Sequence, residues 1–155
     1  MIKLKAKQFH DGCEFLSHLE TFKQYASVPD DSRDALLSGL LRTALAKVGE
    51  FADRALIKTT YVLTTEVGED GGVKLYMGGG AVHSVTDGNG TELSFEQPAQ
   101  GVLKVLHTGT VVVEYTTEPE EADVEMHMTT VSRYATALYD GEATETLNTI
   151  LNEAL

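Results

Sequence analysis

Hydrophobic side chains recur at helical spacing across residues 31–57, the longest periodic stretch of the chain. Intervals of one, three and four residues place them along one broad stripe of an α-helix, and the members are Leu36, Leu37, Leu40, Leu41, Ala44, Leu45, Val48, Phe51, Ala52, Ala55 and Leu56. Asp31 or Ser32 can serve as the N-cap. Burying the stripe contributes on the order of 10 kcal/mol before ordering entropy is subtracted. One helix cannot bury its own stripe, so the rest of the chain must supply a partner surface.

The same spacing predicts further helices over residues 13–27, 120–140 and 142–155. Val28 and Pro29 end the first of them, because the residue before a proline is disfavoured in the helical conformation. The helices over 13–27 and 31–57 should therefore form a short-linked hairpin.

Residues 58–117 change to alternating spacing and are rich in β-branched and aromatic side chains, which is typical of strands. The glycines at 78–80 allow close backbone approach or a positive φ. We predict an antiparallel meander of several short strands. Residues 2–9 also alternate and predict a short strand, with three lysines on its solvent face or edge: Lys3, Lys5 and Lys7.

This order of elements predicts an α+β fold. A bundle of about four helices carries an antiparallel β meander inserted between the second helix and the two C-terminal helices. With 155 residues and 42% hydrophobic side chains, the chain is long enough to bury a sizeable core. We expect a single domain over residues 1–155.

The net charge of −12 is unevenly distributed along the chain. Residues 1–58 carry 9 Lys+Arg and 8 Asp+Glu, whereas residues 59–155 carry 3 and 16. Binding to a phosphate backbone needs cationic contacts, so binding in a nucleic-acid groove is disfavoured. An acidic surface can still act on DNA by repelling it, or it can imitate DNA towards a basic protein.

The setting follows from what the sequence lacks. A single cysteine, Cys13, excludes an internal disulfide and fits a reducing compartment. No apolar run approaches the roughly 18–20 residues that span a bilayer, and the basic residues 1–10 have no apolar segment of a signal peptide behind them. We expect a cytoplasmic protein without a membrane partner.

Catalytic and ligand-binding patterns are weak. His10, Cys13 and His18 offer three loosely spaced ligands where structural zinc takes four, and Cys13 is expected to be a small buried hydrophobe. His83, Ser84 and Asp87 lie too close in sequence for a catalytic triad. We expect no catalytic residue, cofactor or metal, and no enzyme. An enzyme with an unrecognised site stays open; it would need a concave pocket with perturbed titrating groups.

Three stretches resemble the head–tail connector (adaptor) family of tailed bacteriophages. They are residues 18–31 (HLETFKQYASVPDD), residues 34–63 (DALLSGLLRTALAKVGEFADRALIKTTYVL) and residues 110–119 (TVVVEYTTEP), the last followed by a helix that ends in Ala137-Leu138-Tyr139. The chain departs from the family at Thr116-Thr117, where a Gly-aromatic pair is common, and just after Tyr139.

The resemblance implies a structural role. Family members form a ring beneath the portal of the DNA-filled head, twelve-fold on the portal, and extend the DNA channel. They join the head to a stopper or tail-completion protein, and the genome passes through without specific binding. The chain would then reside in the virion neck and, during assembly, in the host cytoplasm. The alternative is an acidic DNA mimic that inhibits a DNA-binding protein.

Three sets of candidate contacts follow from this interpretation. A subunit interface would pair the basic strand with the acidic start of a helix, namely Lys3, Lys5, Lys7, Glu120 and Glu121. An acidic channel wall that repels DNA would use Glu66, Glu69, Asp70, Asp87 and Glu92. A contact with the portal would use the apolar face of the last helix, namely Leu147, Ile150, Leu151 and Leu155.

Overall fold

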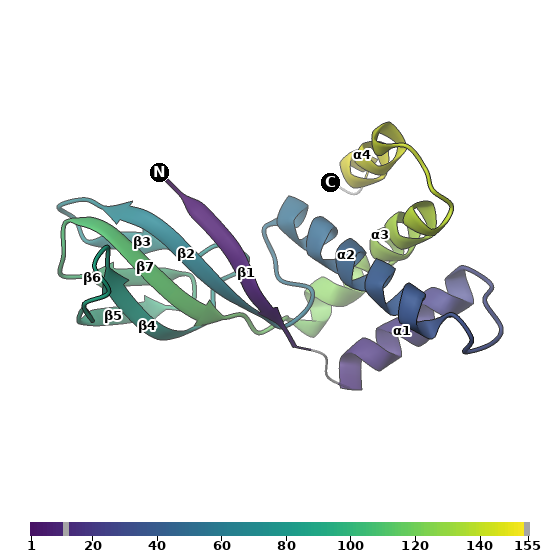
Figure 1. Cartoon of the computed structure of the whole chain (residues 1–155), viewed down its shortest axis with the longest axis horizontal. Helices are drawn as coiled ribbons and strands as arrows, with labels where there is room; N and C mark the ends of the chain where they lie inside the picture. Colours follow the sequence, from purple (N-terminus) through teal and green to yellow (C-terminus); the bar gives the residue numbers. More distant parts are fainter. Residues whose placement is uncertain (11–12, 154–155) are drawn as a thin grey trace. The chain divides into compact units, whose positions relative to one another are not determined.

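The computed structural model describes residues 1–10 and 13–153, with residues 13 and 14 described by their backbone (Figure 1). The helices in this part of the chain are α1 (Cys13–Tyr25), α2 (Asp34–Ala52), α3 (Glu121–Tyr139) and α4 (Thr144–Glu153). The strands are β1 (Lys3–Phe9), β2 (Thr59–Val67), β3 (Gly72–Lys74), β4 (Ala81–Asp87), β5 (Phe95–Ala99), β6 (Val102–Val105) and β7 (Gly109–Thr116). The α+β class is confirmed, with the antiparallel β segment inserted between α2 and α3.

The chain divides into two compact units. The β unit comprises Met1–His10 and Lys58–Glu118, and the helical unit comprises Asp11–Ile57 and Pro119–Leu155. Each unit is built from two separate segments, so the chain passes between the units three times. The single domain over residues 1–155 stays a prediction.

The core of the helical unit is the partner surface that the stripe on α2 requires. Leu37, Leu41 and Ala44 of α2 are fully buried. They belong to one cluster with buried side chains of α1 and α3, which include Phe15, Leu19, Phe22, Val124, Val131 and Ala135. Burial of this stripe is what holds α1 and α3 to the central helix.

Both ends of α2 differ from the prediction. The helix ends at Ala52 instead of residue 57, because Asp53 takes a left-handed conformation with φ 51° and ψ 44°. Arg33 occupies the N-cap position and makes no side-chain cap, so the predicted cap at Asp31 or Ser32 is wrong. Those two residues have other partners, since Asp31 pairs with Lys23 and Ser32 bonds to Asp30.

Lys23 ties the end of α1 to the start of α2. Its side chain is only 5% exposed, and Nζ lies 2.6 Å from Asp31 Oδ1, 2.9 Å from Asp34 Oδ1 and 3.8 Å from Glu20 Oε1. Hydrogen bonds to Asp31 and Asp34 raise the pKa of Lys23 well above its usual value of 10.5. A buried ammonium is tolerated here because carboxylates surround it.

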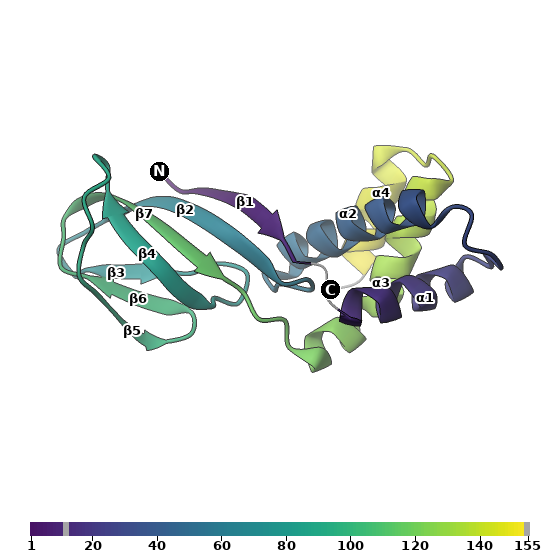
Figure 2. The same cartoon turned by 60° about the horizontal axis from the view of Figure 1, so that its bottom comes forward.

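The β unit consists of two antiparallel sheets, ordered β1-β2-β7-β4 and β3-β6-β5 (Figure 2). Strands β2 and β7 pair without interruption from Thr60 opposite Thr116 to Val67 opposite Gly109. The buried face of β7 carries Val111, Val113 and Tyr115, all 0% exposed. The N-terminal strand β1, far from the others in sequence, adds to the outer side of β2.

Backbone hydrogen bonds join the residues that flank β5 to β4 and to the residue just before it. Leu93 N donates to Val85 O over 2.8 Å, and Gly80 N donates to Gln100 O over 3.1 Å. Gln97 and Pro98 lie within β5. Pro98 is accommodated because the register with β6 is irregular between Glu96 and Ala99.

The glycine run at 78–80 does what the sequence predicted. Gly78 and Gly79 have positive φ values of 84° and 77°. A Cβ on Gly80 would lie 2.0 Å from the backbone oxygen of Thr116. Only a glycine at this position allows β4 to begin so close to the end of β7.

We predict that Gly80→Ala destabilises the β unit by about 1–3 kcal/mol, because the backbone of β7 cannot move away without breaking its ladder. Denaturant unfolding followed by tyrosine fluorescence measures the effect. Gly101→Ala is the matched control, since its Cβ meets nothing within 4 Å. Equal effects of the two substitutions would contradict the steric explanation.

We predict that Lys23→Met lowers the urea midpoint, because Asp31 and Asp34 lose their buried cation. Since the folded-state pKa is raised, the ammonium stabilises the fold fully below pH 10.5, and its contribution is lost as pH rises further. The difference between wild type and Lys23→Met should therefore shrink in strong alkali. Lys47→Met, which removes an exposed pair at 3.7 Å to Glu50, should change little. A midpoint difference that does not vary with pH would contradict a stabilising role of the charged Lys23 side chain.

Candidate assembly surfaces

The predicted subunit contact draws on both units. Lys3, Lys5 and Lys7 are exposed along β1, and Lys7 already pairs with Glu114 of β7 in the same chain. Glu120 is the N-cap residue of α3, and Glu121 lies in its first turn; both are exposed. Carboxylates are favourable at a helix N-terminus without any partner. The pairing of the lysines with Glu120 and Glu121 of another copy stays a prediction.

The five predicted channel carboxylates come together at one end of the β unit. Register places Glu66 opposite Thr110, and Asp87 opposite Val111, so β2 and β4 end beside the start of β7. Glu69 and Asp70 lie in the turn that follows β2, and Glu92 bridges back to Thr86. The sheet register, which sequence spacing does not give, places them at the same end. Glu66 and Asp87 lie in adjacent rows there and so point to opposite faces of the sheet.

Two of these carboxylates also hold their own turns. Asp87 Oδ1 accepts from Asn89 N over 2.8 Å and from Thr91 N over 3.0 Å. These bonds favour the ionised form and lower the pKa of Asp87. Asp70 Oδ1 accepts from Gly72 N over 3.3 Å. Part of the acidic pattern in the sequence therefore serves to stabilise turns.

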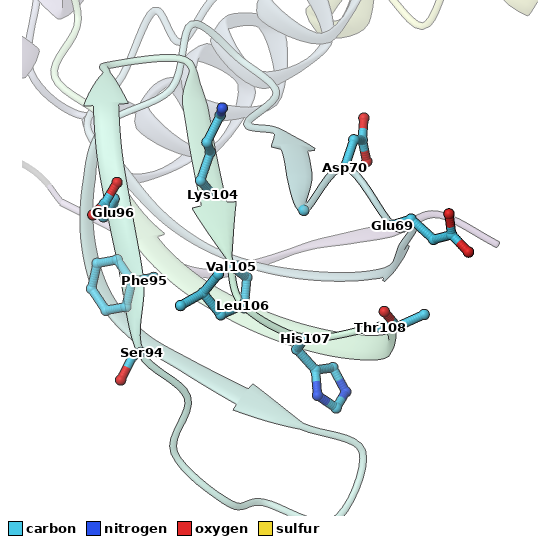
Figure 3. A pocket seen from close by; sticks show the side chains of 11 residues that line it. Glu69, Asp70, Ser94, Phe95, Glu96, Lys104, Val105, Leu106, His107 and Thr108 are labelled. Carbon is cyan, nitrogen blue, oxygen red and sulfur yellow. The ribbon is translucent and has the colours of Figure 1, made fainter.

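A hollow of about 660 Å³ lies at the same end of the β unit (Figure 3). Phe95 and Glu96 of β5 and Lys104 of β6 line it together with Glu69 and Asp70. Leu106, between β6 and β7, is 95% exposed, and Phe95 is 39% exposed. Large exposed apolar side chains ringed by charges suit a contact with another protein. Neither Phe95 nor Leu106 was among the contact residues predicted from the sequence.

The predicted portal contact packs on its own unit. Ile150 and Leu151 of α4 are 7% and 8% exposed and belong to the core of the helical unit, with Leu147 packed against it. Arg133 of α3 and Glu153 of α4 form an ion pair at 2.9 Å. Leu155 lies outside the described residues. To offer this face to a portal, α4 would first have to leave α3.

Three of the groups considered for catalysis or metal binding, His10, His83 and Asp87, have other partners. The Cys13 side chain lies outside the described part of the structure. His10 Nε2 lies 2.9 Å from Thr60 Oγ1, and His83 Nε2 lies 2.6 Å from Thr116 Oγ1. Asp87 binds turn amides, so His83 and Asp87 have different partners and do not converge on Ser84. Among the described residues, no three His, Cys, Asp or Glu side chains gather as metal ligands. In the same part of the chain, no helix combines the length and apolarity needed to cross a bilayer.

The carboxylates divide unequally between the two units, as they do between the two sequence halves. The β unit carries 6 Lys+Arg and 8 Asp+Glu, and the helical unit carries 6 and 16. Most of the negative charge therefore belongs to the helices. In the β unit, the lysines of β1 together with Lys58, Lys74 and Lys104 nearly offset the carboxylates.

Comparisons with solved structures find a similar fold in chains of gene transfer agent (GTA) particles. One similar chain comes from a structure described as the neck of an empty GTA particle computed with C6 symmetry; the TM-score is 0.60 at 16% identity, over 99% of this chain and 94% of that one. Another comes from the virion of a native gene transfer agent (GTA) particle, with a TM-score of 0.58 at 18% identity, over 97% and 93%. No protein-family model and no curated protein matches the sequence.

At such low identity the likeness shows the fold. It extends over both units and nearly the full length of the compared chains, so the α+β arrangement with an inserted β unit is shared as a whole.

Proposed function

We propose that this protein is a structural component of the neck of a tailed-phage-like particle. It forms a ring beneath the portal, extends the DNA channel and joins the head to a stopper or tail-completion protein. It performs no chemistry on the DNA that passes through. In a closed ring each copy presents two different surfaces, one to each neighbour.

The observation that carries the proposal is the full-length likeness to a chain in a particle neck. That structure was computed with six-fold symmetry, which is compatible with rings of six or twelve copies. The local sequence resemblance to connector proteins supports the same role independently, because it rests on residues and not on the fold.

The acidic end of the β unit is proposed to face the channel. Glu66, Glu69 and Glu92 are exposed there, and a wall of like charge repels the phosphate backbone so that DNA slides instead of adhering. Of the two units, the β unit has the smaller net negative charge. The channel proposal therefore depends on this local cluster and not on the charge of the whole chain.

A second candidate is an acidic DNA mimic, favoured by the 16 carboxylates of the helical unit. Such a protein would bind a basic DNA-binding enzyme as a compact particle and would have no affinity for a portal. The full-length likeness to a neck chain makes this the weaker reading.

We predict that the purified protein, mixed with the portal protein of its own phage or prophage, forms a closed ring or a second layer on the portal. Negative-stain electron microscopy and analytical ultracentrifugation detect either assembly. A protein that is monomeric alone but joins the portal also supports the role. A compact particle that stays apart from the portal and instead inhibits a basic DNA-binding enzyme would establish the mimic.

We predict that Glu66→Lys, Glu69→Lys and Glu92→Lys together slow DNA ejection, most strongly at low salt, because the channel would then attract phosphates. These side chains hold no turn, unlike Asp70 and Asp87. The control with the same change of net charge is Glu125→Lys, Glu142→Lys and Glu145→Lys, three exposed positions of the helical unit. Unchanged ejection kinetics in assembled particles would contradict the proposed acidic channel wall.

A further inference from the structure

Strand β1 has an open backbone edge. It is the terminal strand in the order β1-β2-β7-β4, so β2 lies on one side of it and no described strand lies on the other (Figure 1). At the opposite end of this sheet, β4 is covered by the following segment, where Asp87 N donates to Thr91 O and Leu93 N donates to Val85 O. Among the described residues of this sheet, the long edge available for another strand is therefore that of β1.

One face of β1 continues the hydrophobic core without being covered. Leu4 lies opposite Leu63, and Ala6 lies opposite Tyr61. Leu63 and Tyr61 are 0% and 7% exposed, whereas Ala6 is exposed and Leu4 is half-buried. The apolar row thus extends past β2 and ends in solvent.

Both ends of this row are apolar as well. Ile2 is 61% exposed, and Phe9 is 38% exposed. The register shift between Ala6 and Gln8 separates Phe9 from the regular part of β1. A strand placed beside that regular part would cover Ile2, Leu4 and Ala6 with its own alternate residues.

The other face of β1 carries the lysines. Lys3 lies opposite Thr64, and Lys5 lies opposite Val62. Within the described part of the chain, Lys7 pairs with Glu114 while Lys3 and Lys5 form no ion pair. A row of unpaired cations is conspicuous in a chain with a net charge of −12.

These features define the chemistry of an added strand. A second β1 pairing antiparallel with the first would set lysine against lysine, which is unfavourable across a strand pair. A segment with carboxylates at alternate positions would pair with Lys3 and Lys5, and aliphatic side chains between them would cover the apolar row. Glu120 and Glu121 do not meet this description, because they begin a helix.

We propose that β1 accepts, along its open edge, an extended segment of a neighbouring neck protein in which acidic and aliphatic residues alternate. The identity of that neighbour rests on the proposed function; the binding edge does not. Main-chain hydrogen bonds supply the affinity, and the lysine row supplies the charge selection. The competing explanation is that edge lysines only prevent aggregation, in which case no strand binds.

The test titrates ¹⁵N-labelled protein with a synthetic peptide of the length of β1, 7 residues, in which glutamate and valine alternate. Binding should shift the amide signals of residues 2–9 and protect them from exchange. Lys3→Glu with Lys5→Glu should weaken binding on the order of tenfold. A peptide that alternates lysine and valine should prefer this variant over the wild type, which shows that the variant is folded and that charge selects the strand.

Three controls separate strand addition from charge attraction. A peptide of the same composition with its glutamates grouped at one end should bind poorly. N-methylation of the alternating peptide at every second amide should abolish binding for one of the two possible sets. Glu120→Lys with Glu121→Lys should leave peptide binding intact. If this variant alone lost self-assembly, the lysines of β1 would instead pair with Glu120 and Glu121 of another copy.

The outcomes distinguish this inference from the proposed function. No shift in β1, equal binding of the grouped peptide, or insensitivity to charge reversal would overturn the open edge as a binding site, even in a protein that forms rings on the portal. Peptide binding by a protein that never joins a portal would overturn the neck function and leave the edge site standing. Wild-type protein that self-associates through β1 would identify a second copy as the occupant and overturn the choice of partner.

Discussion

The antiparallel pair of β2 and β7 is the constraint on which the rest of the structure depends. At one end, Thr117 N donates to Thr59 O over 2.9 Å, and Lys58 pairs with Glu118, so the chain enters and leaves this part of the β unit side by side. An insert of about 60 residues can therefore interrupt a helical bundle without holding α2 and α3 apart. At the other end, the same register gathers the acidic turns. A shift by one residue would turn Val111, Val113 and Tyr115 out of the core.

The sequence predicted what local spacing controls. Helical periodicity identified the four helices, and alternation identified the strands, including β1. It could not show that β7 lies between β2 and β4, because that order depends on contacts between distant residues. Helix ends were missed for a related reason: Asp53 in a left-handed conformation and Lys23 drawing Asp31 away from a capping role are decided by packing. The glycines at 78–80 were predictable, since positive φ and close approach are constraints on single residues.

The candidate surfaces show the same division. Residues beside turns, such as Glu69 and Asp87, were found from sequence, but only the register showed that they share one end of the β unit. The acidic excess of residues 59–155 is shared between the two units, because this range comprises most of the β unit and the C-terminal part of the helical unit. From the sequence, the apolar stripe of α4 was compatible with packing on its own chain or on a portal. Burial of Ile150 and Leu151 shows that α4 packs on its own helical unit in this structure.

The chain shares its fold with chains of gene transfer agent particles at 16% and 18% identity. Strand β1 is neither a buried core strand nor an ordinary surface strand. Its inner residues Leu4 and Ala6 extend the core pattern, yet they end in solvent, and its lysines oppose the charge of the chain as a whole. If β1 served only to close the sheet, covering its hydrophobic row would add stability. Lysines at alternate positions would then have no purpose. The strand addition proposed above would cover this hydrophobic row and the backbone edge of β1 at the same time, which a free subunit cannot do for itself.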